Sequence, residues 1–305
     1  MGCAMWLIEQ GIPTGHVGSI PLALAFSPDG QRLAVQSPAH GLAVLEPPSL
    51  TPVAVRHFLT AWHGVAFTAE GRVVWSEKGE MRVYDPERQG EPETLPDSKG
   101  CSGVGVSPDG ATVYAGVRDG KTTTIRRWDA RTGQAEDVVG TKKAIHGVAV
   151  SRDGGWLAGF DEQAVRVWRL EGPAAQQKFV RRTRQFNAPR TVAISADGRL
   201  VATTGGGRLR SHPPLYLWDT ATAKEPFPLD HPGSHAGGVA FHPTRPILAS
   251  VGDEGSAVFW DLEGGRELKR FAWPTKGLHA VAFDPHGMRC AAAAMGCVVV
   301  WDVEE

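Results

Sequence analysis

The chain has almost no charge imbalance and no long apolar run. It carries 32 basic and 33 acidic residues among 305, a formal net charge of −1, and so lacks the electrostatic footprint of a nucleic-acid-binding protein. No apolar stretch reaches the roughly 18 residues that a membrane span requires. Residues 1–20 also lack the basic start and apolar segment of a secretory signal. We therefore expect a cytoplasmic protein that binds neither nucleic acid nor membrane.

Cysteine is scarce as well, with four residues in the chain. Four cysteines in a chain of this length do not make a disulfide framework, and reduced thiols fit the expected compartment. Cys290 and Cys297 could face each other across a strand hairpin, but buried free thiols are the preferred interpretation.

Familiar catalytic motifs are missing. The sequence has no His-Glu-x-x-His, no Cys-x-x-Cys and no Gly-x-Ser-x-Gly. Residues 116–122 resemble a phosphate loop, but they have three residues between the glycines instead of four. We expect them in a strand hairpin, where no helix N-terminus is present to hold a phosphate. No cofactor and no metal are predicted.

What the chain does contain is one short phrase in seven copies, an apolar triplet followed by a Pro-Asp-Gly-type turn. The triplet alternates large, small and large residues, as in Val65-Ala66-Phe67, which predicts a strand, and the turn predicts a tight hairpin. The middle residue is Ala in six copies and Gly105 in one, so a neighbouring strand must crowd that side. The copies recur at intervals of about 40 residues, at 24–30, 65–71, 104–110, 148–154, 192–198, 239–245 and 281–287.

A second signal follows each turn, where an apolar segment ends in an aromatic residue and an acid. Each unit then contains enough apolar segments for four strands. The clear cases are Trp128-Asp129, Trp218-Asp219, Trp260-Asp261 and Trp301-Asp302, with Tyr84-Asp85 and Trp168-Arg169 as variants.

With these Trp-Asp pairs and Ser-Pro-Asp-Gly turns at one period, the chain resembles the WD40 repeat family over essentially its whole length. The resemblance implies an all-β fold, a seven-bladed β-propeller of four-stranded antiparallel blades, as one domain over residues 1–305. It also implies a monomeric, non-catalytic scaffold that binds a protein or peptide. The Gly-His pair that is typical of the family occurs only once, at Gly15-His16. His231 lies at an equivalent distance before the apolar triplet of its own repeat.

The two ends of the chain are predicted to complete one blade together. The last repeat stops at Trp301-Asp302, after its third strand, and Met5-Trp6-Leu7-Ile8 has the apolar character of an outer strand. We expect this segment to pair with residues 297–301, which closes the ring and covers two sheet edges.

The position two residues before each apolar triplet varies more than the rest of the repeat. By the resemblance it lies where the innermost strand begins, so it should ring one mouth of the central channel. Its polar members suggest a site for an anionic ligand or a peptide side chain, although polar residues are also simply tolerated at a solvated mouth. A three-histidine zinc site is not favoured, because the histidines belong to separated blades. The residues are Leu22, His63, Ser102, His146, Arg190, Gly237 and His279.

Basic and aromatic residues nearby extend this candidate site. Arg208 and Arg210 lie in the long Gly- and Pro-containing loop 203–214 of the fifth repeat and could form a basic patch with Arg190. Such a patch suits an acidic or phosphorylated partner, although a solvated strand face is the simpler interpretation. Trp62 and Trp273, in the segments that approach the mouth, are candidate interface anchors.

The alternative hypothesis is a propeller enzyme, similar to a lactonase or hydrolase. It would use His63, His146, His279 and Arg190 as general bases and ligands in the channel. The regular Trp-Asp repeats argue against it, because lactonase-like propellers usually lack them.

Overall fold

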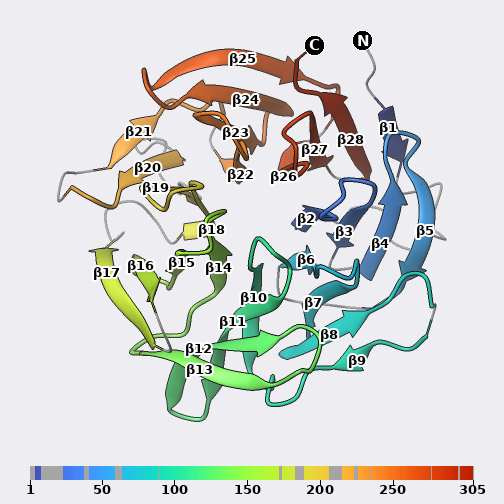
Figure 1. The fold of residues 1–305 in the computed structure, drawn as a ribbon. Coiled ribbons are helices and arrows are strands. Elements are labelled where there is room, and N and C mark those ends of the chain that lie inside the picture. The colour runs from blue at the N-terminus through green and yellow to red at the C-terminus, as the bar shows by residue number, and fades with distance from the viewer. Residues whose placement is uncertain are drawn as a thin grey trace.

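Each copy of the repeated phrase forms the innermost strand of a four-stranded antiparallel sheet, and seven such sheets surround a central opening as the blades of a propeller (Figure 1). The computed structural model therefore confirms the predicted fold. Within the described residues, no helix has the length and apolar character needed to cross a bilayer. The structure describes residues 4–7, 23–37, 41–58, 64–88, 90–171, 174–182, 189–205, 215–222, 226–233, 235–275, 277–294 and 296–304.

Each blade consists of strands that follow one another in the sequence, except that the last blade takes its outer strand from the start of the chain. Blade 1 contains β2 (Ala23–Phe26), β3 (Leu33–Ser37), β4 (Gly41–Glu46) and β5 (Thr51–Arg56). Blade 2 contains β6 (Val65–Phe67), β7 (Val73–Glu77), β8 (Glu80–Tyr84) and β9 (Glu93–Thr94). Blade 3 contains β10 (Cys101–Val106), β11 (Thr112–Asp119), β12 (Thr122–Asp129) and β13 (Ala135–Thr141). Blade 4 contains β14 (Gly147–Val150), β15 (Trp156–Phe160), β16 (Ala164–Glu171) and β17 (Ala174–Arg182).

The remaining blades follow the same order. Blade 5 contains β18 (Pro189–Ile194), β19 (Leu200–Gly205), β20 (Leu215–Asp219) and β21 (Phe227–Leu229). Blade 6 contains β22 (Ala236–Phe241), β23 (Ile247–Gly252), β24 (Ser256–Asp261) and β25 (Arg266–Ala272). Blade 7 contains β26 (Leu278–Phe283), β27 (Arg289–Ala294), β28 (Cys297–Asp302) and β1 (Ala4–Leu7).

The two ends of the chain meet in blade 7, as predicted. β1 pairs antiparallel with β28, with Met5 opposite Val299 and Leu7 opposite Cys297. Figure 1 shows the two termini on neighbouring strands. Ile8 and Gly15-His16 lie outside the described residues. Cys290 lies opposite Trp301 and Cys297 opposite Ala294, so the two cysteines do not face each other, and both are free thiols.

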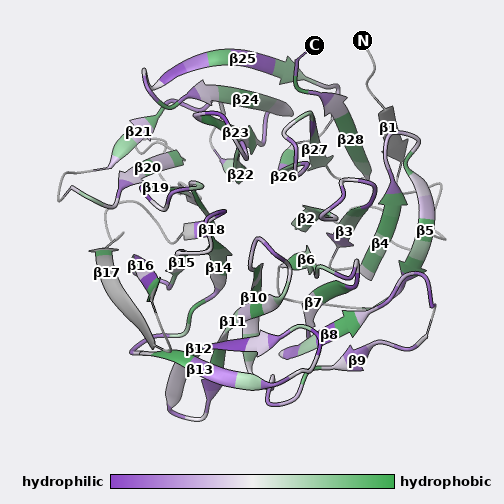
Figure 2. Cartoon of the chain, in the orientation of Figure 1, coloured by the Kyte–Doolittle hydropathy of each residue, from purple (hydrophilic) through white to green (hydrophobic). Residues whose placement is uncertain are grey.

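The core is divided into seven clusters of buried side chains, one between each pair of neighbouring blades. In each triplet the two large residues face the preceding blade; Val65 and Phe67, for example, pack with Leu42 and Val44 of blade 1. The small middle residue faces the next blade. A Cβ atom added at Gly105 would lie 3.1 Å from Cγ2 of Val148 in blade 4, which explains the crowding inferred from the sequence. Figure 2 shows these inner strands as largely hydrophobic and the turns as polar.

The tryptophans that end third strands fill the same interfaces. Trp128, Trp168 and Trp218 are almost completely buried. An unpaired buried donor is costly, and two of these tryptophans pair the indole N–H with a hydroxyl group, whereas Trp301 Nε1 has no partner among the described residues. Trp218 Nε1 donates to Thr203 Oγ1 at 2.8 Å, and Trp260 Nε1 donates to Ser250 Oγ at 2.8 Å. These residues pack blade against blade.

The hairpin turns of four blades are held by a repeated pair of serine and aspartate. Ser27 Oγ donates to Asp29 Oδ1 at 2.5 Å and accepts the Arg32 N–H at 2.9 Å. The same hydrogen bond from Ser107 lowers the pKa of Asp109. Six copies end in a glycine with φ between 70° and 73°, a conformation that favours glycine: Gly30, Gly71, Gly110, Gly154, Gly198 and Gly287.

Blade 6 replaces the serine with His242, and its turn has no glycine at Arg245. The His242 Nδ1 atom accepts the N–H groups of Thr244 at 3.2 Å and Arg245 at 3.0 Å. Its Nε2 atom donates to the Gly287 carbonyl of blade 7 at 3.1 Å. The ring is buried, and burial lowers the pKa of His242. The neutral imidazole thus closes one turn and ties two blades together.

We predict that removing the terminal strand weakens the whole ring. Deleting residues 1–12 removes β1 and leaves the edge of β28 exposed, so the melting temperature should fall by more than about 5 °C. Differential scanning calorimetry measures this. The matched control deletes only residues 1–3, which precede β1, and should melt as the full chain does. An unchanged melting curve for the longer deletion would contradict the closure.

We also predict a loss of stability on mild acidification. As the pH falls through about 6.5, the unfolded chain takes up protons on histidine, whereas His242 in the fold stays neutral because its pKa is lowered. The free energy of unfolding should therefore decrease from pH 7.5 to pH 5.5. His242→Ser introduces the serine that four of the other turns have, and it should flatten this dependence. His231 and His279, whose pKa values are also lowered, keep part of the dependence. Urea unfolding of the wild type and of His242→Ser at both pH values gives the change in the free energy of unfolding with pH for each protein. An equal change in the two proteins would contradict the role of His242.

Candidate functional site

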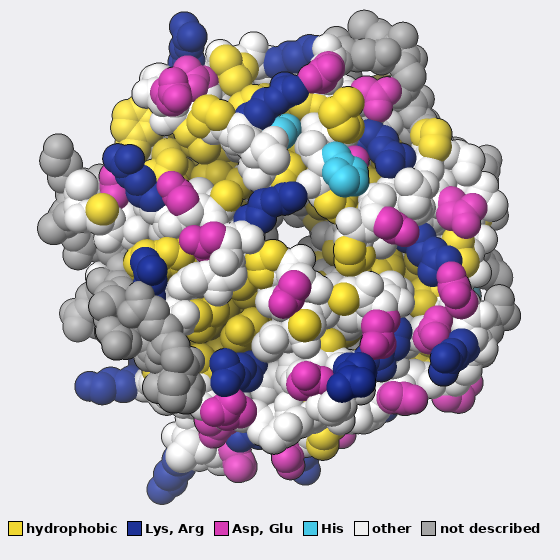
Figure 3. Space-filling view, in the orientation of Figure 1, with side chains coloured by type: hydrophobic (Ala, Val, Ile, Leu, Met, Phe, Trp, Pro, Cys, Tyr) yellow, Lys and Arg dark blue, Asp and Glu magenta, His cyan; other side chains and the backbone are white. Residues whose placement is uncertain are grey.

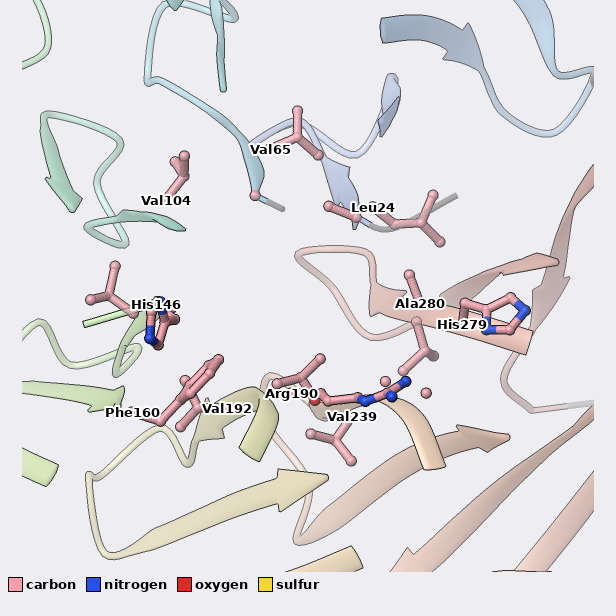
Figure 4. Close-up of a pocket in the computed structure, with 18 of the residues that line it drawn as sticks. Leu24, Val65, Val104, His146, Phe160, Arg190, Val192, Val239, His279 and Ala280 are labelled. Atoms are coloured by element: carbon pink, nitrogen blue, oxygen red, sulfur yellow. The ribbon is translucent and has the colours of Figure 1, made fainter. Parts of the chain in front are cut away.

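The innermost strands enclose a cavity of about 550 Å³ at the end of the channel where these strands begin. We call this end the strand-start mouth. Its wall includes the first apolar residue of all seven triplets, so the scaffold positions that set the fold also line the cavity (Figure 4). These residues are Leu24, Val65, Val104, Val148, Val192, Val239 and Val281.

Three of the predicted candidates stand on this wall, namely His146, Arg190 and His279. Gly237 is there too, as expected from the alignment of the repeats. Ser102 is not on the wall, and its hydroxyl donates instead to the Ile145 carbonyl at 2.5 Å.

Backbone bulges present the variable position to the channel. In β18, Pro189 pairs with Gly205 and Thr191 with Thr204, so Arg190 is the extra residue of a bulge. The same irregularity surrounds His279 in β26, between Leu278 and Ala280. A bulge interrupts the ladder and re-aims the side chain of the extra residue. This local geometry explains why the variable position is free of the packing that fixes the apolar triplet after it.

Arg190 and His279 form one electrostatic unit of the mouth. Arg190 is exposed, and its side chain extends toward His279 in Figure 4. Burial lowers the pKa of His279; Asp253 acts in the opposite sense, and Arg190 lowers the pKa further. The Nε2 atom of His279 is buried and has no hydrogen-bond partner among the described residues. At neutral pH this unit therefore offers one cation and a neutral imidazole.

His146 lies elsewhere on the wall. Its ring is 6.4 Å from the ring of Phe160, and its backbone N–H donates to the Phe160 carbonyl at 2.9 Å. Figure 4 shows His146 and His279 on opposite sides of the cavity. Within the described part of the chain, no three His, Cys, Asp or Glu residues are grouped so that they could hold a metal ion.

An acidic residue and an aromatic residue of the wall were missed at the sequence level. Glu162 is exposed in the turn between β15 and β16, and Phe160 ends β15 just before it. Asp161 between them is buried and paired with Arg166 at 2.8 Å, which fixes the start of this turn. Only the arrangement of blades brings the turn to the mouth, so the sequence offered no signal for it. The mouth is consequently mixed in charge, not purely basic.

The other candidates are not part of the described cavity. Trp62, His63, Arg208 and Arg210 lie outside the described residues, as does Leu22. Trp273 is half-buried and is not on the cavity wall. Its ring lies 4.7 Å from that of Trp301 and 6.1 Å from that of Phe271, within the core between blades 6 and 7.

Comparison with known families locates one repeat directly. The WD40 family model, described as "WD domain, G-beta repeat", matches residues 229–261. This stretch covers β22, β23 and β24 of blade 6. It contains the buried His231 at the Gly-His offset and ends at Trp260-Asp261, whose indole is bonded to Ser250.

Several curated proteins have sequences similar to this chain. Telomerase protein component 1 of Mus musculus is 29% identical over 216 residues, which cover 70% of this chain and 8% of that protein. Striatin-4 of Homo sapiens is 31% identical over 211 residues, covering 64% and 28%. Small ribosomal subunit protein RACK1y of Oryza sativa subsp. japonica is 29% identical over 99 residues, covering 31% and 29%. The chain matches less than a third of the length of each of these relatives.

We predict opposite effects of two neighbours on the pKa of His279. Arg190→Ala removes a nearby positive charge and should raise this pKa, whereas Asp253→Asn removes a negative charge and should lower it. Histidine titrations followed by NMR, with His279→Gln to assign the signal, measure both. Arg131→Ala changes an exposed arginine of blade 3 and should have no effect. If Arg190→Ala also leaves the titration unchanged, the guanidinium does not lie toward His279.

Proposed function

The chain is a WD40-repeat β-propeller, and from this we propose that it is a non-catalytic platform that binds a protein or peptide at the strand-start mouth. WD40 propellers generally act as interaction platforms. The observation that carries the proposal is the cavity itself, in which the first apolar residues of all seven triplets meet polar side chains at the variable positions. A monomeric state and a cytoplasmic location belong to the same proposal.

The cavity has the size and lining of a site for one or two side chains. Its volume of about 550 Å³ falls within the range of ligand pockets, and an apolar wall with few polar groups is the usual composition of such sites. We infer that a partner inserts a side chain into the channel and that the surrounding turns form the polar rim of the interface.

The charges of the rim favour an acidic or phosphorylated partner on one side. Arg190 is exposed and forms no ion pair with a described residue, so its guanidinium is available for a carboxylate or a phosphate. The neutral His279 beside it can contribute a hydrogen bond. Glu162 of blade 4 repels an anion there, so we infer that the acidic group is directed to Arg190 in blade 5.

The enzyme hypothesis receives less support from the same geometry. To transfer a proton together or to bind one metal ion, the histidines would have to lie close to one another. His146 and His279 lie on opposite sides of the cavity (Figure 4). Metal analysis of the purified protein and an esterase and lactonase panel test it. Stoichiometric metal, or turnover that His146→Ala abolishes, would favour the enzyme over the platform.

The proposal predicts the chemistry of selected peptides. Peptides enriched on the immobilised protein from a library that includes phosphoserine should be acidic or phosphorylated. Their affinity should fall about tenfold or more for the triple variant Arg190→Glu, Arg208→Glu, Arg210→Glu. The introduced carboxylates repel the anionic group of the peptide, and this repulsion reduces the binding free energy at least as much as the loss of one charge pair. Isothermal calorimetry with single synthetic peptides gives the dissociation constants.

A second triple variant keeps the change of charge and moves it away from the mouth. Arg88→Glu, Arg131→Glu and Arg266→Glu replace exposed cations of blades 2, 3 and 6, which lie at the turns between third and fourth strands. This variant should bind the selected peptides as the wild type does. Equal loss in both triple variants, or enrichment of neutral and basic peptides, would reject the basic mouth.

A further inference from the structure

The channel has a second mouth, at the end where the seven hairpin turns meet. A cavity of about 560 Å³ opens there, and we call this end the hairpin-turn mouth. Its wall is apolar and aromatic, with Phe26, Phe67 and Phe241 below a rim of prolines. Figure 3 shows the acidic side chains of this face set back from the central opening, while a basic side chain extends over its edge.

One residue breaks the pattern of this rim. The second position of each hairpin turn is Pro or Ala in six repeats, but in blade 4 it is Arg152. The Arg152 Nη1 atom donates to the Pro285 carbonyl of blade 7 at 3.0 Å, so the side chain crosses the mouth from one blade to another that is not its neighbour. The full series is Pro28, Ala69, Pro108, Arg152, Ala196, Pro243 and Pro285.

The charge of Arg152 is not compensated within the cavity. No acidic residue is on its wall among the described residues, and Arg152 forms no ion pair with any of them. The carboxylate next to it in sequence, Asp153, is held in its own turn by Ser151 Oγ at 2.5 Å and Gly155 N at 2.9 Å. Other arginines of this face are paired with acids, as in Arg32–Glu87, Arg245–Glu304 and Arg289–Asp284.

The histidines of the wall do not change this balance at neutral pH. His242 is buried, and its two ring nitrogens are engaged with the Thr244 and Arg245 amides and the Gly287 carbonyl. His286 is exposed on the rim. Positive charge therefore stands over an apolar cavity that is ringed by turns on all sides.

We propose that the hairpin-turn mouth binds the C-terminal carboxylate of a partner polypeptide, with the last side chain packed against the aromatic wall. Because seven turns ring the opening, a polypeptide reaches the cavity end-on, and the C-terminus is the end of a chain that carries negative charge. The carboxylate replaces the Pro285 carbonyl as the acceptor of Arg152, which exchanges a neutral hydrogen bond for a charge-assisted one. This site shares no residue with the strand-start mouth.

Fluorescence anisotropy with four labelled probes tests the proposal. Each probe is a Gly-Ser spacer that ends in Val, Leu, Ile or Phe with a free carboxylate, and its matched control is the same peptide with a C-terminal amide. At least one free acid should bind the full chain, and its amide should bind at least tenfold more weakly. Binding of the amide as tight as that of the acid would overturn the proposal, as would the absence of binding by all four acids at millimolar protein.

Variants of the rim separate the charge from a general loss of structure. Arg152→Ala should weaken the acid probe at least tenfold, and Arg152→Lys should retain part of the affinity. Ala196→Glu, on the equivalent rim position of blade 5, places a carboxylate at the mouth and should abolish binding while Arg152 is still present. Arg131→Ala, an exposed arginine on a turn of blade 3, should bind within about twofold of the wild type. Retained binding in Arg152→Ala would overturn the proposal.

Discussion

Seven strands that converge on one axis impose the constraint on which the rest of this structure depends. Each innermost strand must present large residues to the blade before it and a small residue to the blade after it, because the gap between neighbours narrows toward the channel. The distribution of Val281 and Phe283 against blade 6 and of Gly105 against Val148 follows this rule. Since every interface has the same form, the core is a series of seven clusters and not a single interior. β1 completes the sheet of the last blade by pairing with β28.

The same constraint separates scaffold from site. Residues that pack between blades cannot vary freely. The bulge before the triplet and the second position of the hairpin turn lie outside the interfaces between blades. Arg190 and His279 occupy the first kind of position, and Arg152 occupies the second. Each end of the channel thus receives its arginine from one position of the repeat. The two mouths differ because Glu162 adds negative charge at the first, while the wall of the second has no acid among the described residues.

Much of this architecture could be predicted from the sequence, because the same pattern of large and small apolar residues recurs in all seven repeats. The repeat array and the pairing of the segment that begins at Met5 with residues 297–301 follow from periodicity and from apolar pattern, and the family resemblance of the repeats implies the seven blades. The site was less accessible. His146, Arg190 and His279 were aligned correctly, but the bulges that aim two of them have no sequence signature. Glu162 and Arg152 reach their mouths through three-dimensional arrangement, and no local pattern marks either residue.

We expect partners to bind at the ends of the channel and not along the outer edges of the blades. Hydrogen–deuterium exchange of the full chain, measured by mass spectrometry with and without a peptide selected on the immobilised protein, distinguishes these two locations. Bound peptide should slow exchange at the starts of β14, β18 and β26, next to His146, Arg190 and His279. Slowed exchange confined to outer strands such as β13 and β25, with no change at those three segments, would contradict it.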